Sequence, residues 1–575
     1  MSDAVTTPLR SRTQKAQIYR WRFYGVAAVL LLVVVALVWH LVKLQVLPDT
    51  YRGYEFLQGQ GLARTLRTES IPAYRGVITD RYGEPLAIST PVVSLWANPK
   101  ELLDAPEKVS VLAKSLEMNS EKLQAKLHRY RNKQFMYLRR QMAPEDAKIV
   151  TNLRVKGVYA QQEFQRFYPA GEVAAHLVGF TNVDDKGQEG LELAYEDWLA
   201  GSSGSKQVLK DLSGRVIKDI ALKKEAVSGK DIALSIDLRL QYLAYRELKA
   251  AVKGHAAKSG SIVLLDAKTG EVLAMANQPS FNPNDRSRLK ASALRNRAMT
   301  DQFEPGSTMK PLTIMAALES GRYLPTSTID TNPGYFKVGR KTLLDPVNYG
   351  VMDLTKIITK SSQVGLTKVS LDLEANDIRD MYFRMGLGQS TGTGFPGEAL
   401  GLLPNYARWQ PIVQANFSFG YGLTLTALQL AQAYSVIADN GIKKPVSILK
   451  LDQAQVSDQV VDAKFTQQIV DMLKTVVLPG GTAKRANLEN YTAAGKTGTI
   501  HKVGKEGYAD NRYTSLFAGF APADNPKLIA VVVVNEPSRG KYYGGEVAAP
   551  VFAKVVERSL QLLQVPPTVV QQRQV

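Results

Sequence analysis

The segment from 303 to 311 reads Phe303-Glu304-Pro305-Gly306-Ser307-Thr308-Met309-Lys310-Pro311, and it places a serine three residues before a lysine. Pro305-Gly306 predicts a turn, and Pro311 suits the first turn of a helix, where backbone N–H groups have no partner within the helix. Residues three apart lie on one face of a helix. We therefore expect a helix that starts at Ser307 and holds a hydroxyl and an amine side by side.

Two further motifs follow in the same half of the chain, Ser361-Ser362-Gln363 and Lys496-Thr497-Gly498-Thr499. A serine hydroxyl is a weak nucleophile and needs a base beside it. A lysine can act as that base near neutral pH if burial or a neighbouring positive charge lowers its pKa, and Lys496 is a candidate for that neighbour. Each motif alone is commonplace. Together and in this order they predict a serine acyl-transfer site with Ser307 as nucleophile and Lys310 as base.

The third motif is also typical of an edge strand. Gly495 and Gly498 allow a substrate backbone to approach closely. The hydroxyls of Thr497 and Thr499, together with the ammonium of Lys496, suit a substrate carboxylate.

Composition limits the alternatives. The 575 residues are enough for two or three domains, and there are no cysteines. The five histidines lack metal-ligand spacing, so a zinc hydrolase is disfavoured and no metal is expected. The net charge is +19, but it is spread along the chain and accompanies no nucleic-acid motif. Such a field suits an exported protein that works near anionic lipids and cell-wall polymers.

An apolar run from Gly25 to Val42 predicts a transmembrane helix, because at about 1.5 Å per residue it nearly crosses a bilayer core. Basic residues precede it, so the positive-inside rule predicts a cytoplasmic tail over 1–22, an anchor over 23–44 and an external remainder. A cleaved signal peptide is the alternative, but Lys43-Leu44-Gln45-Val46 is a poor cleavage site.

The rest of the chain divides into two regions. Residues 48–226 contain short β-like runs and no cluster of catalytic residues. Residues 227–564 contain all three motifs, and 565–575 predict a disordered tail. Within the second region we expect a hairpin from 261–265 and 272–276, a buried strand over 528–534, and helices over 311–319, 357–373 and 427–439. Strands at both ends with helices between them predict an antiparallel sheet covered by helices.

Several blocks of sequence resemble one known family over nearly the whole chain. These blocks are Arg75-Gly76-Val77-Ile78-Thr79-Asp80-Arg81-Tyr82-Gly83, Gly187-Gln188-Glu189-Gly190-Leu191-Glu192, Leu265-Asp266-Ala267-Lys268-Thr269-Gly270-Glu271-Val272-Leu273-Ala274 and Gly544-Gly545-Glu546-Val547-Ala548-Ala549-Pro550-Val551-Phe552. With the three motifs, they make the chain similar to the class B penicillin-binding proteins, the membrane-anchored peptidoglycan D,D-transpeptidases, and in particular to their septal type.

This resemblance implies an α/β (α+β) fold class with three parts. They are an N-terminal transmembrane helix, an elongated β-rich pedestal of the dimerisation type, and a penicillin-binding transpeptidase domain like that of serine β-lactamases and D,D-peptidases. It assigns catalysis to Ser307, Lys310, Ser361 and Lys496, and substrate binding to Gln363, Thr497, Gly498 and Thr499. The family usually has asparagine where this chain has Gln363, so the geometry at that position must differ. No cofactor is implied.

The resemblance also implies the reaction and its partners. The substrates are peptidoglycan stem peptides, a D-Ala-D-Ala donor and an amine acceptor, and β-lactams are covalent inhibitors. A membrane-embedded glycosyltransferase and other division proteins are the implied partners, with the catalytic domain in the periplasm and the anchor in the inner membrane. The alternatives are a D,D-carboxypeptidase, an elongation-type or condition-specific paralogue, and a catalytically weak division scaffold.

Overall fold

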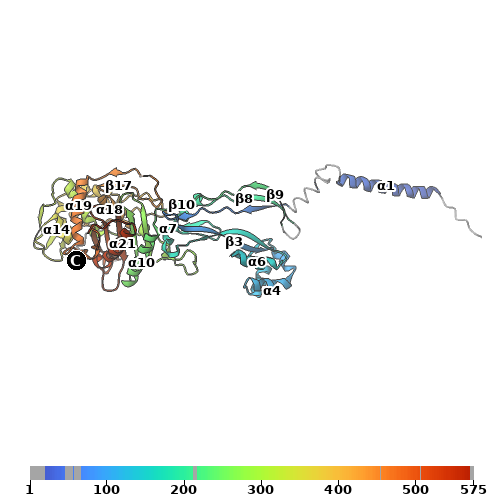
Figure 1. Ribbon diagram of the computed structural model, residues 1–575, viewed down its shortest axis with the longest axis horizontal. Helices are drawn as coiled ribbons and strands as arrows, with labels where there is room; N and C mark the ends of the chain where they lie inside the picture. The colour runs from blue at the N-terminus through green and yellow to red at the C-terminus, as the bar shows by residue number, and fades with distance from the viewer. Residues whose placement is uncertain are drawn as a thin grey trace, which may run out of the picture.

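The computed structural model describes residues 20–45, 56, 66–210, 216–453, 455–504 and 507–569. Figure 1 shows a catalytic domain at one end and a narrow, β-rich pedestal that extends away from it. This arrangement confirms the predicted fold class, a mixed α/β chain with one N-terminal apolar helix and two folded regions.

The N-terminal helix α1 (Arg20–Gln45) contains the predicted anchor. Among the described residues it is the one helix long and apolar enough to cross a membrane, and its apolar side chains are exposed. Most of the predicted cytoplasmic tail, residues 1–19, lies outside the described residues.

Two sheets build the pedestal. One has the order β1 (Leu66–Ile71), β8 (Gly204–Lys210), β9 (Val216–Lys224). The other has the order β10 (Ile232–Ala233), β2 (Ile78–Thr79), β3 (Pro85–Ala97), β4 (Met136–Met142), with β5 (Val158–Phe167) also on β3. β3 pairs with β5 over ten residues, from Ile88 to Ala97. Four short helices pack at the far end of β3: α3 (Pro99–Leu103), α4 (Pro106–Ser115), α5 (Ser120–Arg129) and α6 (Pro144–Asn152).

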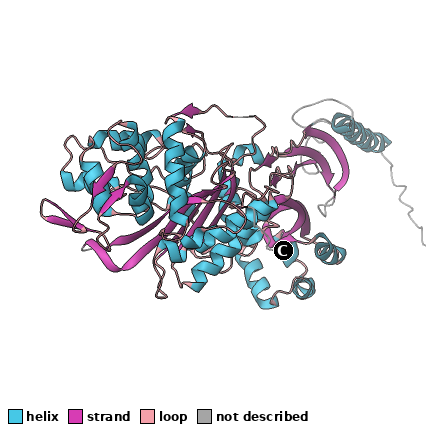
Figure 2. Ribbon diagram, turned by 60° about the vertical axis from the view of Figure 1, so that its left-hand side comes forward, coloured by secondary structure: helices cyan, strands magenta, loops and turns pink. Residues whose placement is uncertain are grey.

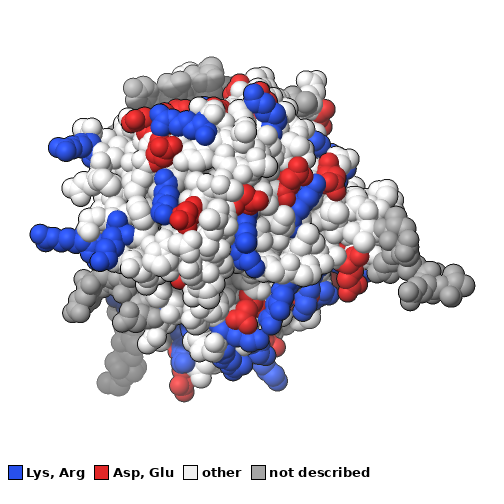
Figure 3. Space-filling view, turned by 90° about the vertical axis from the view of Figure 1, so that its left-hand side faces the viewer, with Lys and Arg blue, Asp and Glu red and all other residues white. Residues whose placement is uncertain are grey.

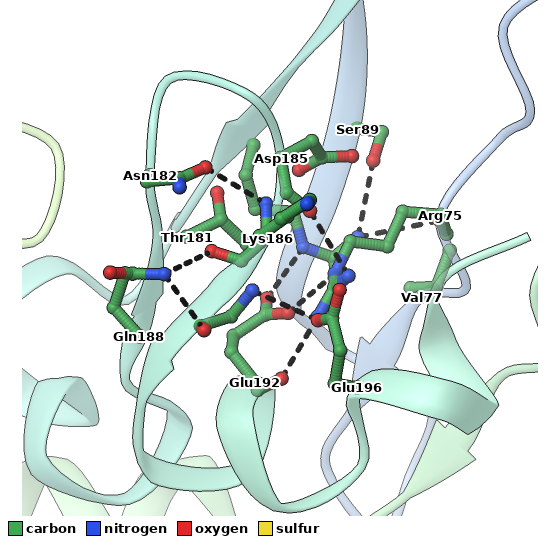
Figure 4. Close-up of polar contacts among 12 residues, drawn as sticks. Arg75, Val77, Ser89, Thr181, Asn182, Asp185, Lys186, Gln188, Glu192 and Glu196 are labelled. Atoms are coloured by element: carbon green, nitrogen blue, oxygen red, sulfur yellow. Dashed lines mark hydrogen bonds and ion pairs between the residues drawn. The ribbon is translucent and has the colours of Figure 1, made fainter.

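A segment of short elements joins the pedestal to the catalytic domain: η1 (Gly171–Val173), α7 (Ala175–Val178), β6 (Phe180–Thr181), β7 (Gly187–Glu189), α8 (Gly190–Ala194) and α9 (Glu196–Leu199). Glu192 is fully buried between two guanidinium groups, 2.7 Å from Arg75 Nε and 2.6 Å from Arg166 Nε. Figure 4 shows how this carboxylate ties the 181–196 loop region to Arg75. Removing one partner of such a buried pair leaves an uncompensated charge, which typically costs about 3–5 kcal/mol.

The catalytic domain is built on a fully antiparallel sheet of order β12 (Val272–Gln278), β11 (Ser259–Asp266), β21 (Leu528–Asn535), β20 (Gly507–Ala521), β19 (Ala494–Gly504). The expected hairpin, the buried strand over 528–534 and the edge position of the 496–499 motif are thereby confirmed. The central strands are buried on both faces, so helices must cover both.

One face of this sheet carries α10 (Leu238–Gly254) and α21 (Ala549–Leu562). A Cβ at Gly260 would touch Leu248 and Val252 of α10, which identifies the face that α10 covers. The opposite face carries α12 (Arg297–Thr300), η2 (Gly306–Met309), α18 (Ala427–Ala438) and α19 (Ala463–Val477). Figure 2 shows the sheet between its two layers of helices.

The remaining elements form a lobe beside the motif-bearing face and small pieces around it. The helices are α11 (Ala291–Leu294), α13 (Lys310–Glu319), α14 (Leu354–Lys360), α15 (Gln363–Leu371), α16 (Ala375–Arg384), α17 (Pro411–Ser418), η3 (Lys484–Ala486) and α20 (Gly544–Val547). The short strand pairs are β13 (Thr328–Asp330) with β16 (Val351–Asp353), β14 (Tyr335–Val338) with β15 (Lys341–Leu344), and β17 (Ile442–Lys443) with β18 (Asp458–Gln459).

Two expectations need correction. The single helix expected over 357–373 is two helices, because the chain turns at Ser361 and Ser362 between α14 and α15. The tail expected to be disordered from 565 is held in its described part, since Thr568 N donates to Asn490 O and Tyr491 Oη donates to Val565 O at 2.9 and 2.8 Å. Residues 570–575 lie outside the described residues.

Most buried apolar residues in the described part of the chain belong to one of two clusters. The larger one is continuous from the catalytic sheet into the joining segment and the near end of the pedestal, where it includes Ile78, Leu86 and Leu191. The smaller one lies under α4, α5 and α6 and includes Leu112 and Leu127. At the exposed end of the catalytic domain, basic and acidic side chains are interspersed among uncharged ones (Figure 3).

Candidate active site

Ser307 lies in the 3-10 turn η2, directly before α13, and its side chain is partly exposed. The expected helical start is therefore a 3-10 turn, in which side chains at i and i+3 eclipse and Ser307 and Lys310 share one side. Gly306 has φ +56°, and a Cβ on Gly420 would lie 2.3 Å from Gly306 O. Tyr434 Oη, on α18, donates to Thr308 O at 2.9 Å and so holds the turn against that helix.

Lys310 is fully buried, and its ammonium points at the second motif. Nζ donates to Ser361 O at 2.6 Å, to Ser361 Oγ at 3.2 Å and to Ser362 O at 3.4 Å. Burial lowers the pKa of Lys310 to about 7, and the negative charge of Asp345 opposes that lowering. A lysine in this state is neutral for part of the time near pH 7, as a general base requires.

Lys496 reaches the same hydroxyl from the edge strand β19. Its Nζ donates to Ser361 Oγ at 3.0 Å, and the side chain is fully buried. Burial, and then the positive charge of Lys310, hold the pKa of Lys496 well below its usual range. The sequence allowed either burial or a neighbouring positive charge as the cause of a lowered lysine pKa. In the structure burial lowers the pKa of Lys310, and burial is the larger of the two causes that lower the pKa of Lys496.

Ser361 has a left-handed backbone, with φ 59° and ψ 38°, at the C-terminal end of α14. This conformation is uncommon for a residue other than glycine and costs about 1–3 kcal/mol. The turn aims both the carbonyl and the hydroxyl of Ser361 at the lysines, which contact it from two different elements. The strain is thus located at the residue that joins the three motifs.

Asp345 is a site residue that sequence reasoning missed. Its buried carboxylate accepts from Ser362 Oγ at 2.5 Å, from Gln363 N at 2.6 Å and from Val364 N at 3.3 Å. The two N–H groups belong to the first turn of α15, where they have no partner within the helix, and a carboxylate caps them well. Asp345 therefore holds the turn that contains Ser361, and it lies in a loop that no sequence motif marks.

The predicted substrate-binding residues surround this cluster. Gln363 begins α15, and its side-chain amide has no hydrogen bond to either lysine within the described part of the chain. Thr497 and Thr499 lie on the face of β19 opposite Lys496, where Thr499 Oγ1 accepts from Gly544 N at 2.9 Å and Thr497 contacts the hydroxyl of Thr482 at 3.1 Å. A Cβ at Gly498 would lie 2.8 Å from the Leu516 side chain and 3.1 Å from Pro305 O, so a larger residue there would press on the neighbouring strand and on the turn before Ser307.

In the part of the chain that the structure describes, no group of three or more His, Asp or Glu side chains is arranged so that it could hold a metal ion. The structure brings together Ser361 and two buried lysines that contact its hydroxyl. The partly exposed Ser307 lies one 3-10 turn before Lys310, and among the described residues its hydroxyl makes no hydrogen bond. This fold and this site define a serine acyl-transfer enzyme.

Comparisons with known proteins agree with that class. Residues 260–557 match the penicillin binding protein transpeptidase domain, and residues 70–234 match the penicillin-binding protein dimerisation domain. The chain therefore belongs to the penicillin-binding protein transpeptidase family.

Similar proteins come from several bacteria. The chain is 42% identical to the peptidoglycan D,D-transpeptidase FtsI of Escherichia coli K12, over 98% of this chain and 95% of that one. It is 41% identical to the probable peptidoglycan D,D-transpeptidase PbpC of Pseudomonas aeruginosa, over 95% and 96%. Among solved structures, penicillin-binding protein 3 of Mycobacterium tuberculosis in complex with aztreonam has a TM-score of 0.69 at 28% identity, covering 87% of this chain and 98% of that one.

Proposed function

We propose that this protein is a septal peptidoglycan D,D-transpeptidase that cross-links stem peptides through an acyl-enzyme on Ser307. The observation that carries this proposal is the contact of Lys310 and Lys496 with one hydroxyl, that of Ser361, where Lys310 lies three residues along the chain from Ser307. The names of the relatives, peptidoglycan D,D-transpeptidases, support the substrate class.

The proposed acylation step assigns the following roles to these groups. The donor stem peptide ends in D-Ala-D-Ala, and Thr497 and Thr499 hold its carboxylate, with Lys496 nearby. Neutral Lys310 takes the proton of Ser307, and Ser307 Oγ bonds to the penultimate carbonyl carbon. The backbone N–H groups of Ser307 and Thr499 stabilise the oxyanion, and removing one such donor typically costs about 3 kcal/mol in barrier.

The second half of the reaction uses the same groups in reverse. When the C–N bond breaks, Ser361 relays the proton to the leaving D-Ala amine, since its hydroxyl contacts both lysines. The amine of a neighbouring stem peptide then attacks the acyl carbon, gives its proton to Lys310 and releases Ser307. The product is a cross-link, and a β-lactam in place of the donor leaves Ser307 acylated.

The anchor gives the topology of the proposal. The basic residues before α1 favour a cytoplasmic N-terminus, so the catalytic domain works in the periplasm on the outer side of the inner membrane. The region before the catalytic domain matches the pedestal pattern and not a glycosyltransferase domain. The proposed partners are therefore a membrane-embedded glycosyltransferase and other division proteins.

Intact-mass measurement with penicillin tests the chemistry. The wild-type protein and Ser320→Ala, a variant at the other end of α13, should gain the mass of one penicillin, and Ser307→Ala should gain none. A wild-type protein that forms no adduct would instead indicate a scaffold without catalysis. Repeated hydrolysis of added β-lactam over many turnovers would indicate transfer to water, as in a D,D-carboxypeptidase.

A further inference from the structure

A small two-stranded hairpin belongs to the lobe that holds the second motif. It consists of β14, a two-residue turn and β15, covers residues 335–344, and is called the basic hairpin below. Asp345 follows it directly, and its backbone N–H donates to Gly334 O at 3.0 Å, which closes the base of the hairpin. The carboxylate of Asp345 accepts from Gln363 N at 2.6 Å. Asp345 therefore links the base of the hairpin to the turn that presents Ser361.

The two faces of the basic hairpin differ. Phe336 and Leu343 are half-buried, Val338 is buried, and Leu343 packs against the main apolar core. Strand residues alternate between faces, so Tyr335 and Leu344, which are cross-strand partners, lie on the outer face. Their side chains are 45% and 60% exposed. The outer face thus carries an apolar pair that is open to solvent.

The charged side chains of the basic hairpin are all positive. Lys337, Arg340 and Lys341 are exposed, and within the described part of the chain their side chains make no ion pair or hydrogen bond. The surrounding segment, residues 335–371, contains six lysine and arginine residues and two aspartates, a net charge of +4. One of these aspartates, Asp345, is buried. This part of the lobe therefore attracts an anionic partner.

The stem peptides of the proposed substrate fit this surface. A stem peptide that is not cross-linked ends in a carboxylate and has alanine methyl groups beside it, so a strand with many stem peptides is a polyanion with short apolar side chains. Its carboxylates complement Lys337, Arg340 and Lys341, and its methyl groups complement Tyr335 and Leu344. An anionic membrane surface fits less well, because α14 of this lobe lies at the end of the catalytic domain away from the pedestal (Figure 1).

Resting on the proposed function, we propose that the outer face of the basic hairpin is a docking surface for the acidic stem peptides of peptidoglycan. The three cations bind carboxylates, and the apolar pair packs against alanine methyl groups. Because Asp345 joins the hairpin to the Ser361 turn, a strand that docks here is held beside the catalytic cluster. Such docking raises the local concentration of stem peptides without contact to the reacting atoms.

Co-sedimentation of the full-length protein with insoluble peptidoglycan sacculi tests this surface. Chitin is the matched polymer, since it has N-acetylated sugars but no stem peptides, and phosphatidylglycerol vesicles test for a lipid partner. The hairpin variant combines Lys337→Gln, Arg340→Gln and Lys341→Gln. The control variant removes the same charge from exposed residues elsewhere on the catalytic domain by combining Lys253→Gln, Arg288→Gln and Lys450→Gln.

The expected loss is specific to sacculi and to low salt. At about 0.1 M salt the hairpin variant should bind sacculi about five- to fiftyfold more weakly than the wild-type protein, and the control variant should bind within about twofold of it. The difference should disappear near 1 M salt, where the screening length is about 3 Å. On chitin all three proteins should bind alike.

Three results would overturn the docking surface: unchanged binding of the hairpin variant to sacculi, an equal loss on chitin, or a loss confined to the vesicles. Penicillin labelling of Ser307 checks the fold, and the hairpin variant should label like the wild-type protein. If it does not, the single variant Arg340→Gln, in the exposed turn, decides by a loss of about twofold or more on sacculi. A wild-type protein that binds sacculi through the hairpin but takes no penicillin would overturn the proposed function alone.

Discussion

Replacing Asp345 by asparagine should move the pH dependence of acylation toward acid. The carboxylate holds the 361–364 turn through three hydrogen bonds, and its charge raises the pKa of Lys310 against the lowering caused by burial. Asp345→Asn keeps the shape of the side chain and an acceptor oxygen, but removes the charge. The pKa of Lys310, about 7 in the wild-type protein, should therefore fall.

The size of the shift follows from the arrangement. Lys310 Nζ contacts Ser362 O and Asp345 contacts Ser362 Oγ, so one residue separates the two charges. Opposite charges at roughly 7 Å contribute about 2 kcal/mol at an effective dielectric constant of about 20. About 1.4 kcal/mol corresponds to one pKa unit, so we expect the pKa of Lys310 to fall by about one and a half units. The weaker, uncharged hydrogen bonds should also cost about 1–2 kcal/mol of stability.

The assay is the second-order rate constant for acylation by a fluorescent penicillin, measured from about pH 5 to about pH 9. The neutral amine is the active base, so the rate rises with pH through the pKa of Lys310. In Asp345→Asn the midpoint of that rise should lie about one and a half pH units lower, whatever the maximal rate is. Asp353→Asn is the matched control, because Asp353 also caps a helix of this lobe, accepting from Lys356 N at 2.6 Å, but is not among the groups that shift Lys310. A midpoint that stays in place or moves to higher pH in folded Asp345→Asn would refute the reasoning.

Three further changes test the turn, the joining segment and the second motif. Gly420→Ala would bring a Cβ against Gly306 O and should abolish penicillin labelling. Gly422 has φ +75° and open space around it, so Gly422→Ala should cost only about 1–2 kcal/mol of stability. Similar labelling of the two variants would contradict this prediction. Glu192→Gln should lower the free energy of unfolding by about 3–5 kcal/mol, measured by thermal unfolding. Glu145→Gln, which breaks an exposed ion pair, should lower it by less than about 1 kcal/mol. Equal melting temperatures for the two variants would count against a stabilising buried network. Gln363→Asn should leave penicillin acylation intact or faster, and a loss beyond about tenfold would show that Gln363 has a role of its own.

Local patterns were enough to predict much of the catalytic domain. The hairpin of β11 and β12 and the buried strand β21 are continuous apolar runs bounded by turn residues, and such runs depend little on distant contacts. The order of the three motifs predicted that Lys310, Ser361 and Lys496 would meet, and the structure brings them together.

Two features could not be predicted because distant contacts create them. Residues 357–373 contain no proline, and their composition suits one helix. The break at Ser361 depends on lysines from α13 and β19 and on the carboxylate of Asp345, which captures the N–H groups of the following turn. Asp345 itself lies in an irregular loop, where an aspartate is common. The neighbouring sequence gives no sign that its carboxylate binds Ser362 and Gln363.

The left-handed turn at Ser361 has an evolutionary consequence. Glycine fits such a backbone without steric cost and asparagine fits with little, but neither has a hydroxyl to relay a proton. Serine at this position thus supplies the hydroxyl at the cost of a less favourable backbone conformation. A selection for heat resistance alone should favour glycine at this position and yield stable but inactive proteins. A selection for cell-wall synthesis should retain serine.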